Sequence, residues 1–257
     1  MKKTLFSLLA FLIFCISAVT SGASGVADTA ISFYIRKNGH SMPVLLEELR
    51  HICNYNCIYV DEKAAARKDK VIYLTFDAGY ENGNVARTLD VLKEENVKGS
   101  FFILSHLIRK NSDLVKRMAE EGHTVCNHTA NHKDMTTLTD AEMIANLNRL
   151  ETAYKECTGR EMEKIFRFPE GRFNARTLKN ASDNGYRTVF WSLAYADWDN
   201  ERQPDPEKAK RILLDNTHDG AIILLHPTSS TNARILKDLI REWKQLGYRF
   251  GDLNEIA

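Results

Sequence analysis

The sequence has almost no net charge, and it contains no internal repeat and no low-complexity tract. Its formal net charge is +1 over 257 residues, which gives no support for nucleic-acid binding because that function favours a basic patch or stripe. Hydrophobic residues make up 44% of the chain and charged residues 27%, as in an ordinary globular protein with one sizeable core. An α/β barrel of roughly this length folds as one domain.

The chain also lacks an apolar run of the roughly 20 residues that comfortably span a bilayer. Its N-terminus instead has a positive start, Met1-Lys2-Lys3, followed by a mostly apolar stretch from Leu5 to Val19. Ser21 and Ala23 then stand at a plausible cleavage spacing, which completes the pattern of a secretory signal. We therefore predict that residues 1–23 are a signal peptide or a membrane anchor. The protein is expected outside the cytoplasm, at the cell wall, with membrane association through this segment left open.

Cysteine is scarce, with four residues outside the N-terminal segment: Cys53, Cys57, Cys126 and Cys157. An even number in an exported chain permits disulfides. Cys53 and Cys57 lie four residues apart in a helix-like stretch, where their sulfurs could meet, could bind a metal or could be partly buried thiols. The sequence leaves these three alternatives open. Cys126 lies in a strand-like run and is expected in the core.

Residues 24–67 are predicted to form a short N-terminal extension, with a helix over 44–52 and a strand over 57–60. The main domain then covers residues 68–257. Within it, strand-like apolar runs alternate with helical stretches, a pattern typical of a parallel sheet, open or closed into a barrel. Thr139 and Glu142 have the spacing of a capping box, which predicts a helix start. The expected strands are 71–76, 99–104, 124–126, 165–166, 188–193, 221–225 and 248–250.

Polar residues that can carry chemistry stand where these apolar runs end. In α/β barrels the reacting groups come from the C-terminal ends of several strands, so we expect these side chains to converge on one face. Each has an ordinary structural role when taken alone, such as turning the chain after a strand. Their joint placement favours a metal-assisted hydrolase. The residues are Asp77, His128, His132, Arg167, Asp197 and His226.

The spacing of His128 and His132 would place two imidazoles on one side of a helical turn, a frequent arrangement for a divalent metal. A zinc protease would need Glu directly after the first histidine, and Thr129 stands there. An isolated pair of this kind would more often be structural. The strand in front of it, together with Asn127, favours metal binding here.

The remaining groups form two complementary pairs. Asp77 could take a proton from metal-activated water, and Arg167 could fix that carboxylate and keep it ionised. His226 could protonate a leaving amine, and Asp197 could raise the pKa of this histidine. Either pair could instead be purely structural. Three aromatic side chains could wall a pocket for a sugar or simply fill the core: Phe168, Trp191 and Trp198.

Taken in order, the short segments around these residues resemble the motifs of the polysaccharide deacetylases of carbohydrate esterase family 4, which share the NodB homology domain. The resemblance covers residues 71–257. It implies a distorted (β/α) barrel and metal-dependent removal of an acetyl group from an N-acetylated glycan. The matching segments are Thr75-Phe76-Asp77, His128-Thr129-Ala130-Asn131-His132, Arg167-Phe168-Pro169, Ala194-Tyr195-Ala196-Asp197-Trp198 and Leu224-Leu225-His226.

The resemblance also implies a role for each residue. Asp77 would be the base and His226 the acid, with Arg167 orienting the first and Asp197 tuning the second. The metal ligands would be His128 and His132, with zinc as the expected divalent ion. The residues expected to contact substrate are Leu224 in the acetyl pocket, Tyr80, Phe168, Arg172 and Trp198.

Two departures from the family pattern bear on specificity. Ala78 replaces the family's second Asp, usually the third metal ligand, which would leave two histidines plus water with weaker affinity, or an unusual ligand from elsewhere. The stretch Asp77-Ala78-Gly79-Tyr80-Glu81-Asn82-Gly83 is similar to the muramic δ-lactam-forming peptidoglycan deacetylases of spore-forming bacteria. Glu170 stands where that branch tends to carry Arg. If that Arg meets a lactyl carboxylate, either Arg172 has taken its role or the specificity differs.

We therefore expect a deacetylase of N-acetylmuramic acid in peptidoglycan strands, whose product leads to the muramic δ-lactam of spore cortex. The resemblance implies a functional partnership with a peptide-trimming amidase. One alternative is a deacetylase of N-acetylglucosamine or chitin-type glycans. Another is a degenerate glycan-binding module, which Ala78 suggests but the retained acid and base disfavour.

Overall fold

The computed structural model describes residues 29–256, so the predicted signal segment lies outside the described part. An eight-stranded sheet forms its centre, in the order β10-β3-β4-β5-β6-β8-β2 with β9 also paired to β3. Each of these pairs is parallel. The strands are β2 (Cys57–Ile58), β3 (Val71–Ala78), β4 (Ser100–Ile103), β5 (Thr124–Asn127), β6 (Ile165–Phe166), β8 (Arg187–Val189), β9 (Ala221–Leu225) and β10 (Arg249–Phe250).

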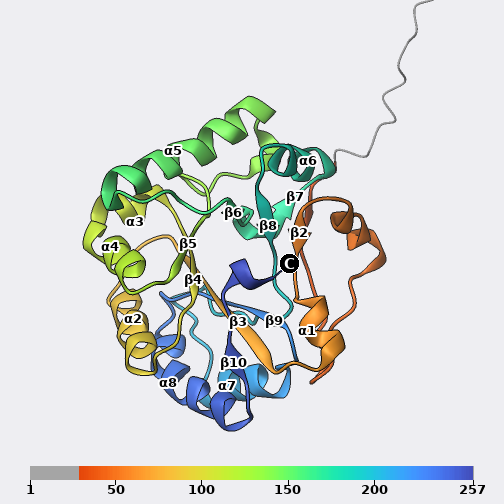
Figure 1. Ribbon diagram of the computed structural model, residues 1–257, viewed down its shortest axis with the longest axis vertical. Helices are drawn as coiled ribbons and strands as arrows, with labels where there is room; N and C mark the ends of the chain where they lie inside the picture. Colours follow the sequence, from red (N-terminus) through yellow and green to blue (C-terminus); the bar gives the residue numbers. More distant parts are fainter. Residues whose placement is uncertain (1–28, 257) are drawn as a thin grey trace, which may run out of the picture.

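The sheet curls into a distorted barrel with the helices around its outside (Figure 1). Between β9 and the β8–β2 end of the sheet, the described residues form no continuous strand pairing. Two isolated bridges join these parts, a parallel one between Leu193 and Ile223 and an antiparallel one between Val60 and Ala221. The expected distorted (β/α) barrel is confirmed. The helices are α1 (Glu62–Arg67), α2 (Asn84–Glu94), α3 (Ser105–Lys110), α4 (Ser112–Glu120), α5 (Asp140–Thr158), α6 (Ala175–Asp183), α7 (Pro206–Asp215) and α8 (Ser230–Gln245), with 3-10 turns η1 (Glu47–Asn54), η2 (Met135–Thr137), η3 (Pro169–Gly171) and η4 (Leu253–Glu255).

The central strands are the apolar runs of the sequence. All five residues of β9 are buried, as are all of β3 except Asp77, because helices cover a parallel sheet on its outer face while side chains fill its inside. The capping box at the start of α5 is also confirmed, with Thr139 and Glu142 each accepting from the other's backbone N–H. Gly159, at φ 72°, ends this helix.

Some predicted boundaries differ from the structure. The helix predicted over 44–52 is the 3-10 helix η1, and the strand predicted over 188–193 ends at Val189. After Val189 the chain leaves β6 and crosses toward β9, where Ser192 N–H donates to the carbonyl of Ile222 at 2.9 Å. The apolar run therefore continues through a crossing segment that pairs only locally.

The predicted N-terminal extension is tied into the same fold. β2 lies beside β8 in the main sheet, and β1 (Ile31–Ser32) pairs antiparallel with β7 (Arg172–Phe173). Cys53 and Cys57 are free thiols, and Cys126 is fully buried, as expected. Within residues 29–256, no helix combines the length and apolar character that a membrane crossing requires.

Candidate active site

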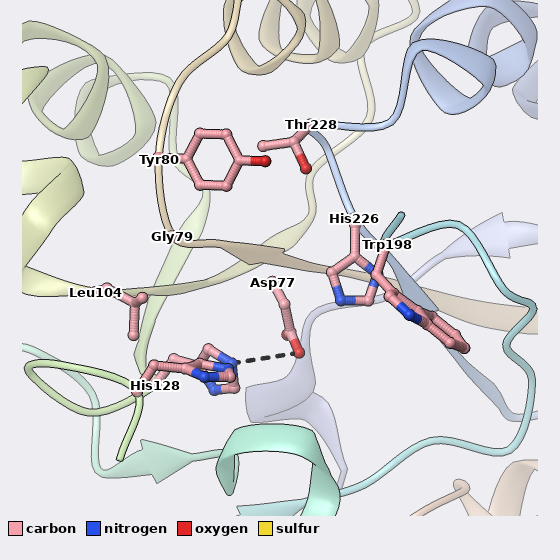
Figure 2. A pocket seen from close by; sticks show the side chains of 9 residues that line it. Asp77, Gly79, Tyr80, Leu104, His128, Trp198, His226 and Thr228 are labelled. Carbon is pink, nitrogen blue, oxygen red and sulfur yellow. Dashed lines mark ion pairs between the residues drawn. The ribbon is translucent and has the colours of Figure 1, made fainter. Parts of the chain in front are cut away.

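The C-terminal ends of the central strands bring the predicted residues together. Asp77 is the penultimate residue of β3, His128 directly follows β5, and His226 directly follows β9. Figure 2 shows Asp77 between the side chains of His128 and His226. These groups line a cavity of about 230 Å³, together with Gly79, Tyr80, Leu104, His132, Trp198 and Thr228.

Arg167 fixes the position of Asp77. Its Nη1 donates to Asp77 Oδ1 at 2.7 Å, and its Nη2 donates to Thr75 Oγ1 at 3.0 Å. Nε donates to the carbonyl of Val189 at 3.0 Å, and the guanidinium carbon lies 4.0 Å from the centroid of the Phe102 ring. Arg167 is fully buried. It is therefore a rigid cation with one charged partner, the carboxylate of Asp77.

Burial opposes the charge on Asp77, but nearby groups outweigh it. The positive charge of Arg167 and its hydrogen bond lower the pKa of Asp77 below its ordinary value. Its side chain is only 10% exposed, and its second oxygen, Oδ2, lies 3.6 Å from His128 Nε2. Asp77 is therefore ionised at neutral pH, with one oxygen directed toward the histidine pair.

His128 and His132 meet by a different geometry from the one predicted. They lie in a loop rather than a helical turn, and both Thr129 and His132 have positive φ, at 77° and 56°. The Thr129 N–H donates to Asn127 Oδ1 at 2.8 Å, and the His132 N–H donates to Thr129 Oγ1 at 2.9 Å. These bonds fold the loop so that the two ring centroids are 5.0 Å apart.

His128 is held in the form that binds metals. Its Nδ1 lies 2.9 Å from the carbonyl oxygen of Arg167, which can only accept, so Nδ1 carries the proton and Nε2 keeps its lone pair. Burial lowers the pKa of His128 to about 4, against the opposing effect of Asp77. The imidazole is therefore neutral at physiological pH.

The two imidazoles suit a divalent ion, since neutral histidine nitrogen is a common zinc ligand. Within residues 29–256, no group of three or more His, Cys, Asp or Glu side chains is arranged to hold a metal. Ala78 is fully buried in β3 and offers no donor. His128 and His132 are thus the protein donors that fit a metal here, and its other positions would be open to water or substrate.

On the other side of the cavity, Asp197 holds His226. Asp197 Oδ1 lies 2.7 Å from His226 Nδ1, while Oδ2 accepts from the His226 backbone N–H at 2.8 Å. Asn232 Nδ2 donates to the same Oδ2 at 2.6 Å, and the Tyr195 hydroxyl donates to Asn232 Oδ1. Asp197 is 1% exposed. This network directs the other ring nitrogen of His226, Nε2, away from Asp197.

Burial favours neutral His226, but Asp197 reverses the balance. Its hydrogen bond and negative charge raise the pKa of His226 above the ordinary histidine value. One cavity thus contains a carboxylate kept ionised and an imidazole that retains its proton to higher pH. This is the protonation pattern of a general base and a general acid.

The predicted substrate contacts divide into two groups. Tyr80 and Trp198 line the small cavity, and Leu224 lines a larger cavity that also contains Asp77 and His226. Phe168 is fully buried and packs against Phe166 at 4.6 Å between ring centroids, so it is a core residue and not a pocket wall.

Arg172 also lies apart from the cavities, on β7. Its Nε donates to Asp134 Oδ2 at 2.7 Å, and it lines neither cavity. Glu170 does line the larger cavity, where it holds a left-handed conformation with φ 55°. Whether Arg172 takes the role of an arginine at position 170 stays a prediction.

The structure adds residues that the sequence did not single out. Asn232 lies in the first turn of α8, where a polar residue is unremarkable in the sequence, yet its side chain contacts both Asp197 and the backbone of His226. Glu81 accepts from the N–H groups of Gly83 and Val85 at the start of α2. Asn82 donates to the carbonyl of Thr228 at 2.8 Å. The loop after β3 is thereby tied to the loop after β9.

Comparison with known proteins places this site in a family. Residues 64–189 match the model of the polysaccharide deacetylases. The peptidoglycan-N-acetylmuramic acid deacetylase PdaA of Bacillus subtilis is 35% identical over 91% of this chain and 88% of its own. A solved structure of PdaA, described as a family 4 carbohydrate esterase, superposes with a TM-score of 0.84 over 90% of this chain and 98% of that chain.

A second solved structure bears on activity. A family 4 pseudoenzyme from Bacillus anthracis is 28% identical, with a TM-score of 0.67 over 73% of this chain and 65% of that chain. The fold thus occurs both in enzymes and in a protein described as a pseudoenzyme. The overall similarity extends beyond the five motifs to nearly the whole described chain. The chain belongs to the polysaccharide deacetylase family, hydrolases that remove N-acetyl groups from glycans.

Proposed function

We propose that this protein is an exported deacetylase of peptidoglycan that acts on N-acetylmuramic acid, and that its product leads to the muramic δ-lactam of spore cortex. The proposal is supported chiefly by two groups in one cavity: Asp77, whose pKa is lowered, and His226, whose pKa is raised. The substrate is suggested by the likeness to PdaA. The cell wall outside the cytoplasm, with a peptide-trimming amidase acting upstream, is the setting that this substrate implies.

The residues divide the hydrolysis between them. A divalent metal bound by His128 and His132, zinc by expectation, would polarise the acetamide carbonyl and lower the pKa of water. Asp77 takes the proton from the attacking water, and Arg167 keeps this carboxylate ionised and in place. Backbone N–H groups would help to stabilise the oxyanion.

His226 completes the reaction as a general acid. Asp197 stabilises the positively charged imidazole of His226. As the C–N bond breaks, this imidazole donates its Nε2 proton to the departing amine and becomes neutral. Water is consumed, and acetate and a free amine are produced. On muramic acid that amine can then close onto its own lactyl carboxylate with loss of water, which gives the δ-lactam.

Substrate choice is tested by comparing acetate release from peptide-free peptidoglycan strands and from chitooligosaccharides at equal concentrations of acetyl groups. We expect the muramic-containing strands to give the higher kcat/KM. In strands that carry both sugars, mass analysis of the product would locate the lost acetyl group on muramic acid, as a free amine or as the δ-lactam. Loss of acetyl groups from glucosamine alone would contradict the proposed specificity.

A second candidate is a deacetylase of N-acetylglucosamine or chitin-type glycans. The observation that favours it is Glu170 in the wall of the larger cavity, because its carboxylate would repel a lactyl carboxylate at close range. Faster release from chitooligosaccharides would support this candidate. Glycan binding that persists after chelation, with no acetate released from any substrate, would instead identify a binding module.

A further inference from the structure

A larger cavity adjoins the catalytic one and includes part of the N-terminal extension. Its volume is about 700 Å³, compared with about 230 Å³ for the cavity around Asp77, and this lies within the roughly 300–1,000 Å³ of ligand pockets. Asp77, His128 and His226 line both cavities. The additional wall includes Ser32, Phe33, Tyr34, Ile35 and Lys37.

This N-terminal wall is fixed to the barrel. The Phe33 N–H donates to the carbonyl of Gly171 at 2.8 Å, and the Phe33 ring stacks on Phe190 at 4.3 Å between centroids. Gly171 permits this close approach, because a Cβ at that position would lie 2.8 Å from the Trp191 ring and 3.2 Å from Phe33. The segment is therefore a built part of the site and not a loose extension.

The same anchoring turns Tyr34 outward. Phe33 and Ile35 are buried, whereas Tyr34 is 56% exposed, as expected where side chains alternate along an extended segment. Trp198, from the loop after β8, is 62% exposed and lines the same cavity. Large exposed aromatic side chains in a cleft mark a binding surface, and their flat faces suit the C–H faces of sugar rings.

Lys37 gives this wall a positive charge. It is exposed, and among the described residues its side chain has neither a hydrogen bond nor an ion pair. Of the described residues that line the larger cavity, Lys37 alone has a permanent positive charge. Peptide-free peptidoglycan carries a free lactyl carboxylate on each muramic acid. Lys37 attracts this group on the N-terminal side of the cavity, whereas Glu170 and Asp77 in its other walls repel it.

We propose that residues 32–37 form a glycan subsite beside the catalytic centre, in which Tyr34 packs against a sugar ring and Lys37 attracts the lactyl carboxylates of a peptide-free strand. This inference rests on the proposed function, because it takes peptidoglycan as the substrate. The subsite binds sugars next to the reacting one. It therefore contributes to strand affinity and leaves the chemical step unchanged.

The test measures acetate release and strand binding for Tyr34→Ala and Lys37→Gln. On long peptide-free strands we expect Tyr34→Ala to raise KM by about 3- to 10-fold with kcat unchanged, as for the loss of one aromatic contact. On the shortest substrate, the N-acetylmuramic acid monosaccharide, the KM should change little. Lys37→Gln should raise KM for muramic strands by about 2- to 5-fold at low salt, and this effect should fade at high salt.

Matched controls separate these effects from general damage. Tyr34→Phe and Lys37→Arg keep the ring and the charge and should behave as wild type. Val44→Ala, a 67% exposed position in the same region, and Lys116→Gln, on the surface of α4, should change nothing. Lys37→Gln should also leave activity on chitooligosaccharides unaltered, because these carry no carboxylate.

Two results would overturn the subsite. One is a Tyr34→Ala protein with wild-type KM on long strands. The other is an equal rise in KM on long strands and on the monosaccharide, which would place Tyr34 at the reacting sugar. If wild-type protein released no acetate at all, the proposed function would fail. Calorimetric binding of the same strands to wild type and Tyr34→Ala would then still decide the subsite, with equal affinities counting against it.

Discussion

Asp77→Asn is expected to lower the kcat of acetate release by about 10²–10⁴-fold, the usual contribution of a positioned general base. Asn has the size of Asp and can still accept a hydrogen bond from Arg167, but it cannot take a proton from water. The effect should fall on kcat more than on KM, because proton transfer occurs in the transition state. Initial rates of acetate release on peptide-free strands measure both constants.

Asp134→Asn is the matched control for this change. Asp134 also pairs with an arginine, Arg172, at 2.7 Å, but outside the two cavities. Its loss should leave kcat unaltered. Circular dichroism and thermal unfolding of the Asp77→Asn protein would show whether the fold persists with Arg167 lacking its anionic partner. A folded Asp77→Asn protein with wild-type kcat would refute the assignment of the base.

Asp197→Asn is expected to reduce kcat by a similar factor of about 10²–10⁴. The carboxylate of Asp197 raises the pKa of His226 and fixes the proton on Nδ1. Without this charge, His226 loses its second proton at a lower pH, so the general acid disappears earlier as pH rises. The alkaline limb of the pH–kcat profile should therefore move toward lower pH.

Asp199→Asn provides the comparison for this shift. Asp199 lies on the same loop, is about half exposed and has a 4.0 Å contact with Arg202, so its replacement should leave the alkaline limb in place. The acid limb of the pH–kcat profile should stay at low pH in both proteins, since Arg167 lowers the pKa of Asp77 against the effect of burial. An alkaline limb that did not move in Asp197→Asn would contradict the role given to His226.

The central strands could be predicted because they are unusually apolar. β9 and most of β3 are buried completely, so their sequences are continuous hydrophobic runs, and a polar residue directly after such a run must lie at the strand end. This reasoning located Asp77 and His226. It also located His128, which directly follows β5, but the helical turn predicted between His128 and His132 was wrong. The loop instead depends on positive φ at Thr129 and His132, which local hydrogen bonds stabilise and no periodicity reveals.

Roles that depend on contacts between residues far apart in the chain could not be predicted from local sequence patterns. Asn232 reaches Asp197 from a helix 35 positions further along the chain, and an Asn near a helix start is ordinary by itself. Phe168 was expected to contact substrate, with a place in the core as the alternative, and its ring is fully buried in the core. The weakly periodic segment around Tyr34 predicted no helix or strand. Its position depends on contacts of Phe33 with Gly171 and Phe190, which lie far along the chain.

The most direct test of the account is acetate release from peptide-free glycan strands after the protein has been stripped with a chelator, with and without added zinc. We predict no release from the stripped protein and recovery when zinc is added, with His128 and His132 as protein ligands. His132→Ala should prevent the recovery. A stripped protein that binds zinc and retains the strands but releases no acetate would contradict the account and favour a glycan-binding module.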